Sequence, residues 1–246
     1  METAQESTTA GIEPHAAGRE LERIYAAYDR RDQSIPATRY ARMERVNLCR
    51  AHERELALAD LLHSAGLASL KGMRILDLGC GRGSTLRQLL EYDAEPSMLF
   101  GLDLLENRIV PASRLSPNLQ FLRGNASQLP FRDASFQLVT QFLLLTSVLD
   151  GSFKRAIAQE ISRVLPARGK LLWYDFAYNN PKNPDVRGIG RAEIKRLFPG
   201  WRITLRRITL APPLAKMIGR ISPAVYYALA GMPFLCTHYI GLLEKP

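Results

Sequence analysis

Short apolar segments and amphipathic segments alternate through the central part of the chain. Five apolar segments have the length and composition of β-strands, and they cover residues 74–78, 98–103, 119–123, 136–144 and 170–176. Apolar residues recur with helical spacing between several of them, for example over 84–92 and 154–165. Strands that are apolar along most of their length, separated by helices, predict an α/β fold in which a parallel sheet is covered on both faces.

A different pattern precedes this region. Residues 1–18 are mostly small and polar without periodicity, and we expect them to form a disordered tail. Over residues 19–72 apolar positions recur at three- and four-residue spacings in two groups: Leu21, Ile24 and Tyr28, then Leu48, Leu56, Ala59 and Leu62. Pro36 separates the groups, because a proline disfavours helix in the residue before it. The sequence therefore predicts an N-terminal helical cap over 19–72, ahead of a main domain over 73–246.

Two further strands are predicted near the C-terminus. Residues 201–210 alternate with a period of two, and residues 237–243 form another candidate strand. The segment between them, 211–236, is rich in proline and apolar side chains. We interpret it as a lid-like insertion before the last strand.

The composition is that of an ordinary globular protein, with 46% hydrophobic and 23% charged residues. The three cysteines, Cys49, Cys80 and Cys236, are odd in number and scattered, and they indicate neither a disulfide framework nor a zinc or other metal site. The N-terminal residues lack the pattern of a secretory signal, and no apolar run reaches the roughly 18 residues that cross a bilayer. We therefore expect a cytoplasmic protein.

The net charge of +9 is concentrated in one part of the chain. Ten basic residues fall between positions 182 and 220, where only Asp185 and Glu193 oppose them. This excess favours an anionic partner, such as a phosphorylated acceptor, an anionic lipid surface or nucleic acid. A solvated basic face without a partner explains it equally well.

A glycine-rich loop follows the first predicted strand of the main domain. Gly79, Gly81 and Gly83 stand where a helix is expected to begin, so a ligand can approach bare backbone and unpaired N–H groups. The sixth position of the loop is Ser84, so the spacing is G-x-G-x-G and departs from the G-x-G-x-x-G of dinucleotide-binding loops.

Two acidic residues flank this loop in the predicted sheet. Asp77 precedes the first glycine by two residues, where it would repel a pyrophosphate but suits a ligand that carries an ammonium group. Asp103 ends the second predicted strand, where a carboxylate can accept hydrogen bonds from both hydroxyls of a ribose. The alternative for Asp103 is a strand-end acid that only begins a turn.

Four blocks of the sequence, at 75–83, 101–109, 124–139 and 160–176, resemble class I S-adenosylmethionine-dependent methyltransferases of the ubiquinone-biosynthesis-like or type 11 group. They read ILDLGCGRG, GLDLLENRI, GNASQLPFRDASFQLV and EISRVLPARGKLLWYDF. The resemblance implies a Rossmann-like, doubly wound seven-stranded sheet of order 3-2-1-4-5-7-6, with the last strand antiparallel. It also implies S-adenosyl-L-methionine as the cofactor, with S-adenosyl-L-homocysteine as the product.

By position, the resemblance also implies which residues contact the cofactor. Those near its methionine part are Asp77, Gly79, Cys80, Gly81, Gly83 and Gln141, while Asp103 holds the ribose and Leu104, Asn125 and Ala126 lie against the adenine. The family usually has aspartate in place of Asn125. The amide oxygen can still accept a hydrogen bond from the adenine amino group, but without charge assistance.

No motif defines the catalytic residues, because the sulfonium methyl group is already activated and a base is needed only for a protonated nucleophile. In the implied topology the last strand begins at the edge where the parallel strands end, so His238 is expected on the active-site side. His238 is our first candidate for a general base, oriented by Asp175 or Tyr174, and Tyr178 is the second candidate. Packing near the strand end explains a histidine at this position at least as well.

Two covering elements are also predicted around the site. Tyr25, Tyr28 and Tyr40 are candidates to close over the cofactor, with core packing as the alternative. The insertion at 211–236 is expected either to cover the apolar part of an acceptor or to contact a membrane beside Lys216 and Arg220.

The sequence therefore predicts methyl transfer to a small-molecule or glycan-type acceptor that is anionic or has an apolar part. Residues 174–187 resemble bacterial methyltransferases of polysaccharide and secondary-metabolite biosynthesis, which favours O-methylation, in the cytoplasm or at the inner face of the membrane. A nucleic-acid methyltransferase is disfavoured, because Gln141-Phe142-Leu143-Leu144 stands where an Asn-Pro-Pro-Tyr-type tetrad would be expected. A non-catalytic binding protein with this fold is a third possibility and a nicotinamide dehydrogenase the last, and the sequence gives no oligomeric state.

Overall fold

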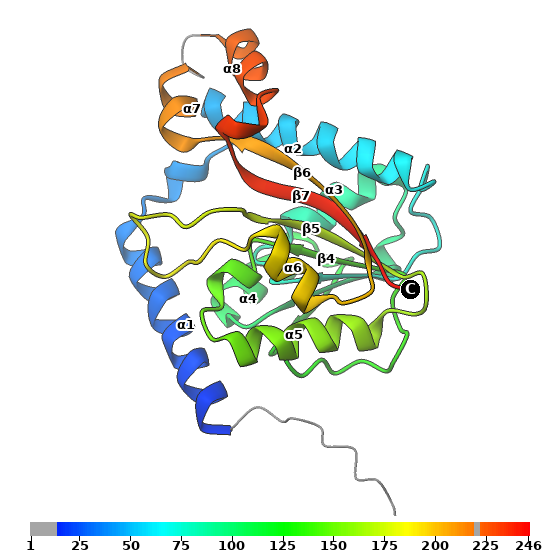
Figure 1. Cartoon of the computed structure of the whole chain (residues 1–246). Coiled ribbons are helices and arrows are strands. Elements are labelled where there is room, and N and C mark those ends of the chain that lie inside the picture. The colour runs from blue at the N-terminus through cyan, green and yellow to red at the C-terminus, as the bar shows by residue number, and fades with distance from the viewer. Residues whose placement is uncertain (1–13, 219–221) are drawn as a thin grey trace, which may run out of the picture.

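The computed structural model describes residues 14–218 and 222–246, and its centre is a seven-stranded sheet of order β3-β2-β1-β4-β5-β7-β6 (Figure 1). The strands are β1 (Ile75–Leu78), β2 (Leu99–Asp103), β3 (Gln120–Arg123), β4 (Leu138–Phe142), β5 (Lys170–Phe176), β6 (Arg202–Leu210) and β7 (Cys236–Glu244). The first five strands are parallel, and β7 is antiparallel to both of its neighbours. These findings confirm the predicted doubly wound sheet, its strand order and its antiparallel last strand.

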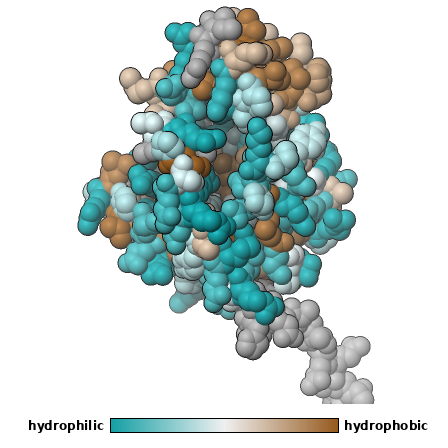
Figure 2. Space-filling view, turned by 90° about the vertical axis from the view of Figure 1, so that its left-hand side faces the viewer, coloured by the Kyte–Doolittle hydropathy of each residue, from teal (hydrophilic) through white to brown (hydrophobic). Residues whose placement is uncertain are grey.

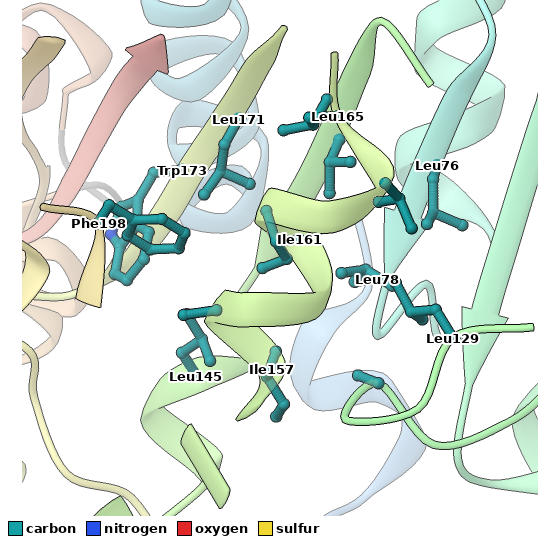
Figure 3. Close-up of a cluster of buried hydrophobic side chains, with 14 of the residues drawn as sticks. Leu76, Leu78, Leu129, Leu145, Ile157, Ile161, Leu165, Leu171, Trp173 and Phe198 are labelled. Atoms are coloured by element: carbon teal, nitrogen blue, oxygen red, sulfur yellow. The ribbon is translucent and has the colours of Figure 1, made fainter. Parts of the chain in front are cut away.

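Helices cover both faces of the sheet. α2 (Arg45–Ser64) and α3 (Ser84–Leu89) share a buried apolar cluster with one face. α5 (Gly151–Val164) and α6 (Arg191–Leu197) share another with the opposite face. In Figure 3 the α5 side chains Ile157 and Ile161 lie among leucines of β1 and β5. Helices therefore shield both faces of β1 from solvent, and all four of its residues are buried.

The remaining helices occupy the connections. α4 (Glu106–Leu115) packs against β2 and β3. The short 3-10 helices are η1 (Ala37–Tyr40), η2 (Leu90–Tyr92), η3 (Pro96–Met98) and η4 (Leu145–Ser147).

The first helix, α1 (Pro14–Ser34), lies across the edge at which the parallel strands end (Figure 1). The Tyr25 hydroxyl is 3.4 Å from the carbonyl oxygen of Leu104, which follows β2, and the Tyr28 hydroxyl is 3.3 Å from Oγ of Ser147, which follows β4. A single helix thus reaches residues after two different strands. It covers the edge where ligands bind in open parallel sheets.

The start of α1 corrects one predicted boundary. The helix begins at Pro14, so residues 14–18 are helical although we expected them in a disordered tail, and residues 1–13 lie outside the described part of the chain. Ile24 is buried and Leu21 and Tyr28 pack against the same cluster, which confirms the predicted apolar face of this helix.

The predicted apolar face of α2 is confirmed at Leu62, which is buried, but was wrong at Leu48 and Leu56. Leu48 and Leu56 are 39% and 64% exposed, whereas the buried residues of the helix are Cys49, Ala57, Leu58, Leu61 and Leu62. The helix also reaches β6, β7 and α8, so the side that it buries is set by tertiary partners that its own spacing does not specify.

The insertion before the last strand forms α7 (Pro212–Ile218), α8 (Pro223–Ala230) and the 3-10 helix η5 (Pro233–Leu235). Its ends meet through a hydrogen bond from the Ala211 N–H to the Leu235 carbonyl, with 2.9 Å between N and O. Tyr226 of α8 is buried in a small cluster with Cys49 of α2 and Leu210 of β6. Within the described residues, no helix has both the length and the apolarity needed to cross a membrane.

Candidate cofactor and acceptor site

The glycine loop between β1 and α3 requires glycine at its three glycine positions. Gly79, Gly81 and Gly83 have φ angles of +70°, +54° and +75°, a region in which other residues are strained. A Cβ at Gly83 would also lie 2.6 Å from Cζ of Phe121. The loop brings bare backbone to the start of α3, as the sequence predicted.

Asp103 ties this loop to the end of β2. Its Oδ2 accepts a hydrogen bond from the Gly81 N–H at 2.8 Å, and its Oδ1 accepts one from the Leu105 N–H at 2.9 Å. Burial raises the pKa of the carboxyl group, although these two hydrogen bonds act in the opposite direction. Each oxygen keeps a further lone pair, so the carboxylate fits the two hydroxyls of a ribose without losing its hold on the loop.

Asp77 has an acceptor atom without a partner. It is buried on β1, and its Oδ1 accepts a hydrogen bond from Oγ1 of Thr140 at 2.6 Å. Its Oδ2 is buried and has no hydrogen-bond partner among the described residues. Burial, with a smaller contribution from Asp103, raises the pKa of Asp77 to about 7. A buried carboxylate oxygen that lacks a donor matches the ammonium group of a methionine-like ligand.

Gln141 carries the complementary feature on β4. It is completely buried, its Oε1 is 3.4 Å from the Leu145 amide N, and its Nε2 donates no hydrogen bond to a described residue. The register pairs Gln141 with Leu78, the residue after Asp77. Thr140, which bonds to Asp77, and Gln141 are successive residues of β4, so the unpartnered acceptor and the unpartnered donor point to opposite faces of the sheet.

The residues predicted near the adenine follow β2 and β3. Leu104 is half-buried and lies beneath Tyr25 of α1, and Ala126 is buried. The Asn125 Oδ1 already accepts hydrogen bonds from the N–H and Oγ of Ser127, at 2.9 and 3.0 Å. These two bonds use both lone pairs of the Asn125 Oδ1, so the Nδ2 is the group that can still bond to the adenine ring. The expected bond from an adenine amino group to this oxygen is not favoured by the geometry.

Cys80 is a structural member of the loop. Burial raises the pKa of its thiol, and the neighbouring carboxylates Asp77 and Asp103 raise it further. The thiol therefore stays protonated and takes no part as a nucleophile.

His238 lies at the start of β7, at the edge where β5 ends. It is only 5% exposed, and its ring stacks on Tyr174 with centroids 4.9 Å apart and lies 4.1 Å from the ring of Phe176. Its Nδ1 is 3.0 Å from Oγ1 of Thr237. Burial, reinforced by the charges of Arg50 and Arg54, lowers its pKa to about 3. The imidazole is therefore neutral at physiological pH.

Asp175 does not contact His238. Its carboxylate is buried and bonded to the N–H and hydroxyl of Thr146. Burial raises its pKa to about 6, although the bonds from Thr146 counteract this. Of the two residues predicted to orient His238, only Tyr174 touches it.

Tyr178 lies apart from His238. It is 46% exposed, and the Arg207 guanidinium carbon lies 4.4 Å from its ring centroid and 5.6 Å from that of Tyr239. Tyr239 and His238 are successive residues of β7 and therefore point to opposite faces of the sheet. The structure does not bring the two candidate catalytic residues together. The side chain of Tyr40, the third tyrosine predicted to cover the cofactor, lies outside the described part.

Several basic residues of the segment 182–220 form ion pairs within the protein. Arg187 pairs with Glu193, Arg202 with Glu244 and Arg206 with Asp60. Three of its ten basic residues are therefore paired with acids of the protein.

The sequence did not single out a set of charged residues on α2. Arg50, Glu53 and Arg54 lie among Tyr174, Tyr226 and His238, as their mutual contacts and electrostatic effects indicate. The available signal was their spacing, which continues the buried stripe of Ala57, Leu58, Leu61 and Leu62 toward the N-terminus of the helix.

Known proteins agree with this description of the central segment. Residues 75–169 match the family model described as "Methyltransferase domain". The demethylmenaquinone methyltransferase of Lactococcus lactis is 34% identical over 117 residues, which are 46% of this chain and 45% of the relative. The phthiotriol/phenolphthiotriol dimycocerosates methyltransferase 1 of Mycobacterium ulcerans is 36% identical over 113 residues, 45% of this chain and 40% of the relative. The chain thus spans less than half the length of these two relatives.

A solved structure extends the agreement to the fold. The S-adenosylmethionine-dependent methyltransferase from Mesorhizobium loti superposes with a TM-score of 0.56 at 18% identity, over 74% of this chain and 95% of that one. Residues 75–169 therefore match a methyltransferase domain, and the fold is shared with a methyltransferase of known structure. The resemblance to methyltransferases predicted from the four sequence blocks is confirmed.

Proposed function

We propose that the whole protein transfers the methyl group of S-adenosylmethionine to a small-molecule acceptor. The observation that carries the proposal is the buried Asp77 Oδ2, which accepts no hydrogen bond from a described residue. Beside it lie the loop whose three glycines have positive φ angles and Asp103, whose carboxylate can accept bonds from a ribose. When bound, the cofactor supplies an activated, electrophilic methyl group. Asp77 and Gln141 would hold its amino-acid end, Asp103 its ribose, and Leu104, Asn125 and Ala126 its adenine.

The protein itself contributes alignment and the exclusion of water. α1 covers the strand edge through Tyr25 and Tyr28, through Glu20, which accepts a bond from the Leu149 N–H, and through Arg23, which donates to the Ser147 carbonyl. A covered site favours methyl transfer, because held reactants need no further ordering and water cannot compete for the methyl group.

His238 remains our proposal for the group that accepts a proton from the acceptor, and Tyr178 remains the second candidate. A pKa of about 3 makes the imidazole a weak base. This assignment therefore suits an acceptor whose hydroxyl is already acidic, such as a phenol or enol, better than an ordinary sugar hydroxyl. It keeps O-methylation in secondary-metabolite or polysaccharide biosynthesis as the proposed reaction, with the phenolic acceptor favoured over the glycan.

The apolar surface of the insertion supports a contact with lipids or a lipid-like acceptor. In Figure 2, which looks at the side of the molecule where α1 lies in Figure 1, apolar side chains gather at the top, over α7 and α8. Exposed apolar residues there include Met217, Val225, Met232 and Phe234, with Lys216 beside them. We propose peripheral contact with the inner face of a membrane at this surface. Arg220, the other basic residue expected there, lies outside the described residues.

Calorimetric titration with S-adenosylhomocysteine tests the proposed function, with NADH as the control ligand. We expect micromolar affinity for S-adenosylhomocysteine and none for NADH. A protein that binds S-adenosylhomocysteine but methylates no acceptor in a screen of phenols, quinols and glycosides would be a binding protein. A protein that binds neither ligand contradicts the cofactor assignment.

A further inference from the structure

The buried stripe of α2 changes from apolar to charged along the helix. Toward its C-terminal end the stripe is formed by Ala57, Leu58, Leu61 and Leu62. One and two turns earlier, equivalent positions carry Arg50, Glu53 and Arg54. Charged side chains facing the body of a protein are costly unless they meet a partner.

Several N–H groups of the two arginines lack a hydrogen-bond partner among the described residues. Nε and Nη2 of Arg50 and Nε of Arg54 are buried, and none donates a hydrogen bond to a described residue. The Arg54 guanidinium carbon lies 5.6 Å from the ring centroid of Phe142 and 5.5 Å from that of Tyr174. Buried donors of this kind are rare in proteins, and a ligand is one of the few reasons to retain them.

The neighbouring acids are already engaged. Glu53 accepts hydrogen bonds from the Thr209 N–H at 2.6 Å and the Tyr226 hydroxyl at 2.7 Å. Asp77, the carboxylate on which Arg54 acts, already accepts a bond from Thr140, and burial holds its pKa near 7. His238 is neutral because its pKa is low. Glu53 acts on Arg50 and Asp77 acts on Arg54 through their charges, but neither carboxylate accepts a hydrogen bond from these guanidinium groups.

The register places this charge between the cofactor residues and His238. Phe142 pairs with Tyr174, one position beyond the pair of Leu78 and Gln141 and thus level with Gly79. His238 pairs with Phe176, two positions further along β5. Arg54 stands over the first of these levels, and both arginines act electrostatically on His238. With the cofactor at the glycine loop and His238 as the base, as proposed above, the methyl acceptor would lie in this interval.

We propose that Arg50 and Arg54 bind an anionic group of the methyl acceptor, a carboxylate or a phosphate. Guanidinium groups offer paired N–H donors that match both groups. Binding there would supply the missing hydrogen-bond partners and orient the acceptor toward the glycine loop. The inference rests on the proposed function, because it takes the region of Asp77 to Gly83 as the cofactor site.

The test uses the full chain saturated with S-adenosylhomocysteine and titrated with phenyl phosphate, with benzoate and phenol as companion probes. We expect phenyl phosphate or benzoate to bind at least about tenfold more tightly than uncharged phenol. In the Arg50→Gln/Arg54→Gln variant this preference disappears. S-adenosylhomocysteine binding persists with a smaller change, since no cofactor residue is replaced and Arg54 acts on Asp77 only through its charge. Arg45→Gln, an exposed arginine of the same helix, is the matched control and keeps the preference.

Several results would overturn the inference. They are an unchanged preference in the double variant, equal affinity of the wild type for phenol and the anions, or a parallel loss of S-adenosylhomocysteine binding, which would assign the arginines to the cofactor. The double variant also separates ligand binding from a structural role, because loss of buried N–H groups that lack hydrogen-bond partners should leave the unfolding midpoint unchanged or raise it. Arg50→Lys, which keeps the charge without the paired donors, should retain part of the preference. If the wild type fails to bind S-adenosylhomocysteine, the proposed function fails, and the anion titration without it still decides whether the arginines bind an anion.

Discussion

The carboxylate of Asp103 bonds to the backbone of Gly81, 22 residues earlier in the chain, with 2.8 Å between Oδ2 and the amide N. The end of β2 and the glycine loop after β1 are therefore one unit, although each follows a different strand. A residue assigned to ligand binding is thus also a support for the loop, and substitutions of it report on both roles.

Replacement of Asp103 by alanine should weaken S-adenosylhomocysteine binding by about 2–4 kcal/mol, because two charge-assisted hydrogen bonds to the ribose are lost. Calorimetry measures the change. Glu106→Ala is the control, since Glu106 is 67% exposed and pairs with Arg123 on the surface. Wild-type affinity in Asp103→Ala would show that the ribose lies elsewhere.

Asp77 should make the protein without cofactor less stable as the pH rises. Burial raises its pKa from 3.8 to about 7, so between these values the native state keeps a proton that the unfolded state has released. The free energy of unfolding then falls with rising pH, by up to about 1.4 kcal/mol per unit. Urea unfolding from pH 4.5 to 7.5 should show a smaller fall in Asp77→Asn. Equal slopes in the two proteins would contradict the raised pKa.

Glu20 should hold α1 on the strand edge. Its carboxylate accepts bonds from the Leu149 N–H at 2.6 Å and from Arg23, and these lower its pKa although burial acts in the opposite direction. Glu20→Ala leaves the Leu149 donor unpaired, at a cost of about 1–3 kcal/mol. Hydrogen exchange should accelerate in residues 14–34 while β4 and β5 stay protected. The exposed Glu22→Ala on the same helix should change neither, and unchanged exchange in Glu20→Ala would mean that α1 is held by other contacts.

His238→Asn should slow methyl transfer by roughly 10²-fold or more if the imidazole takes the acceptor proton. Affinity for S-adenosylhomocysteine should not change. Nuclear magnetic resonance of the wild type should find the imidazole neutral down to about pH 4, because its pKa is about 3. Transfer at the full rate in the variant would remove His238 from the mechanism.

The sequence predicted the strands well, because β1 and β4 are short, mostly apolar segments, with Asp77, Thr140 and Gln141 as their polar residues. The order of the strands followed from the resemblance to methyltransferases. The glycine loop and its acids were also predictable, since left-handed backbone at Gly79, Gly81 and Gly83 admits little besides glycine.

The covering elements were less predictable. The apolar face of α2 depends on β6, β7 and α8, which are far away in sequence, so its own spacing suggested Leu48 and Leu56 and missed Arg50 and Arg54. The residue that contacts His238 could not be predicted from the sequence either. Tyr174 and Asp175 are successive residues of β5 that point to opposite faces, and only the register decides which of them meets the histidine.

α1 is bonded to residues after three strands: to Leu104 after β2, to Ser147 after β4, and through Arg30 to Asp185 after β5. It belongs to no sheet and is followed directly by Ile35 and Pro36, where the helix ends. For a cofactor bound at this edge, as proposed above, these three bonds would have to open together before α1 could move away. The movement of this one helix would then govern how long a ligand stays bound. Substitutions in α1 would change the rate of product release even where the substituted residue does not contact the product.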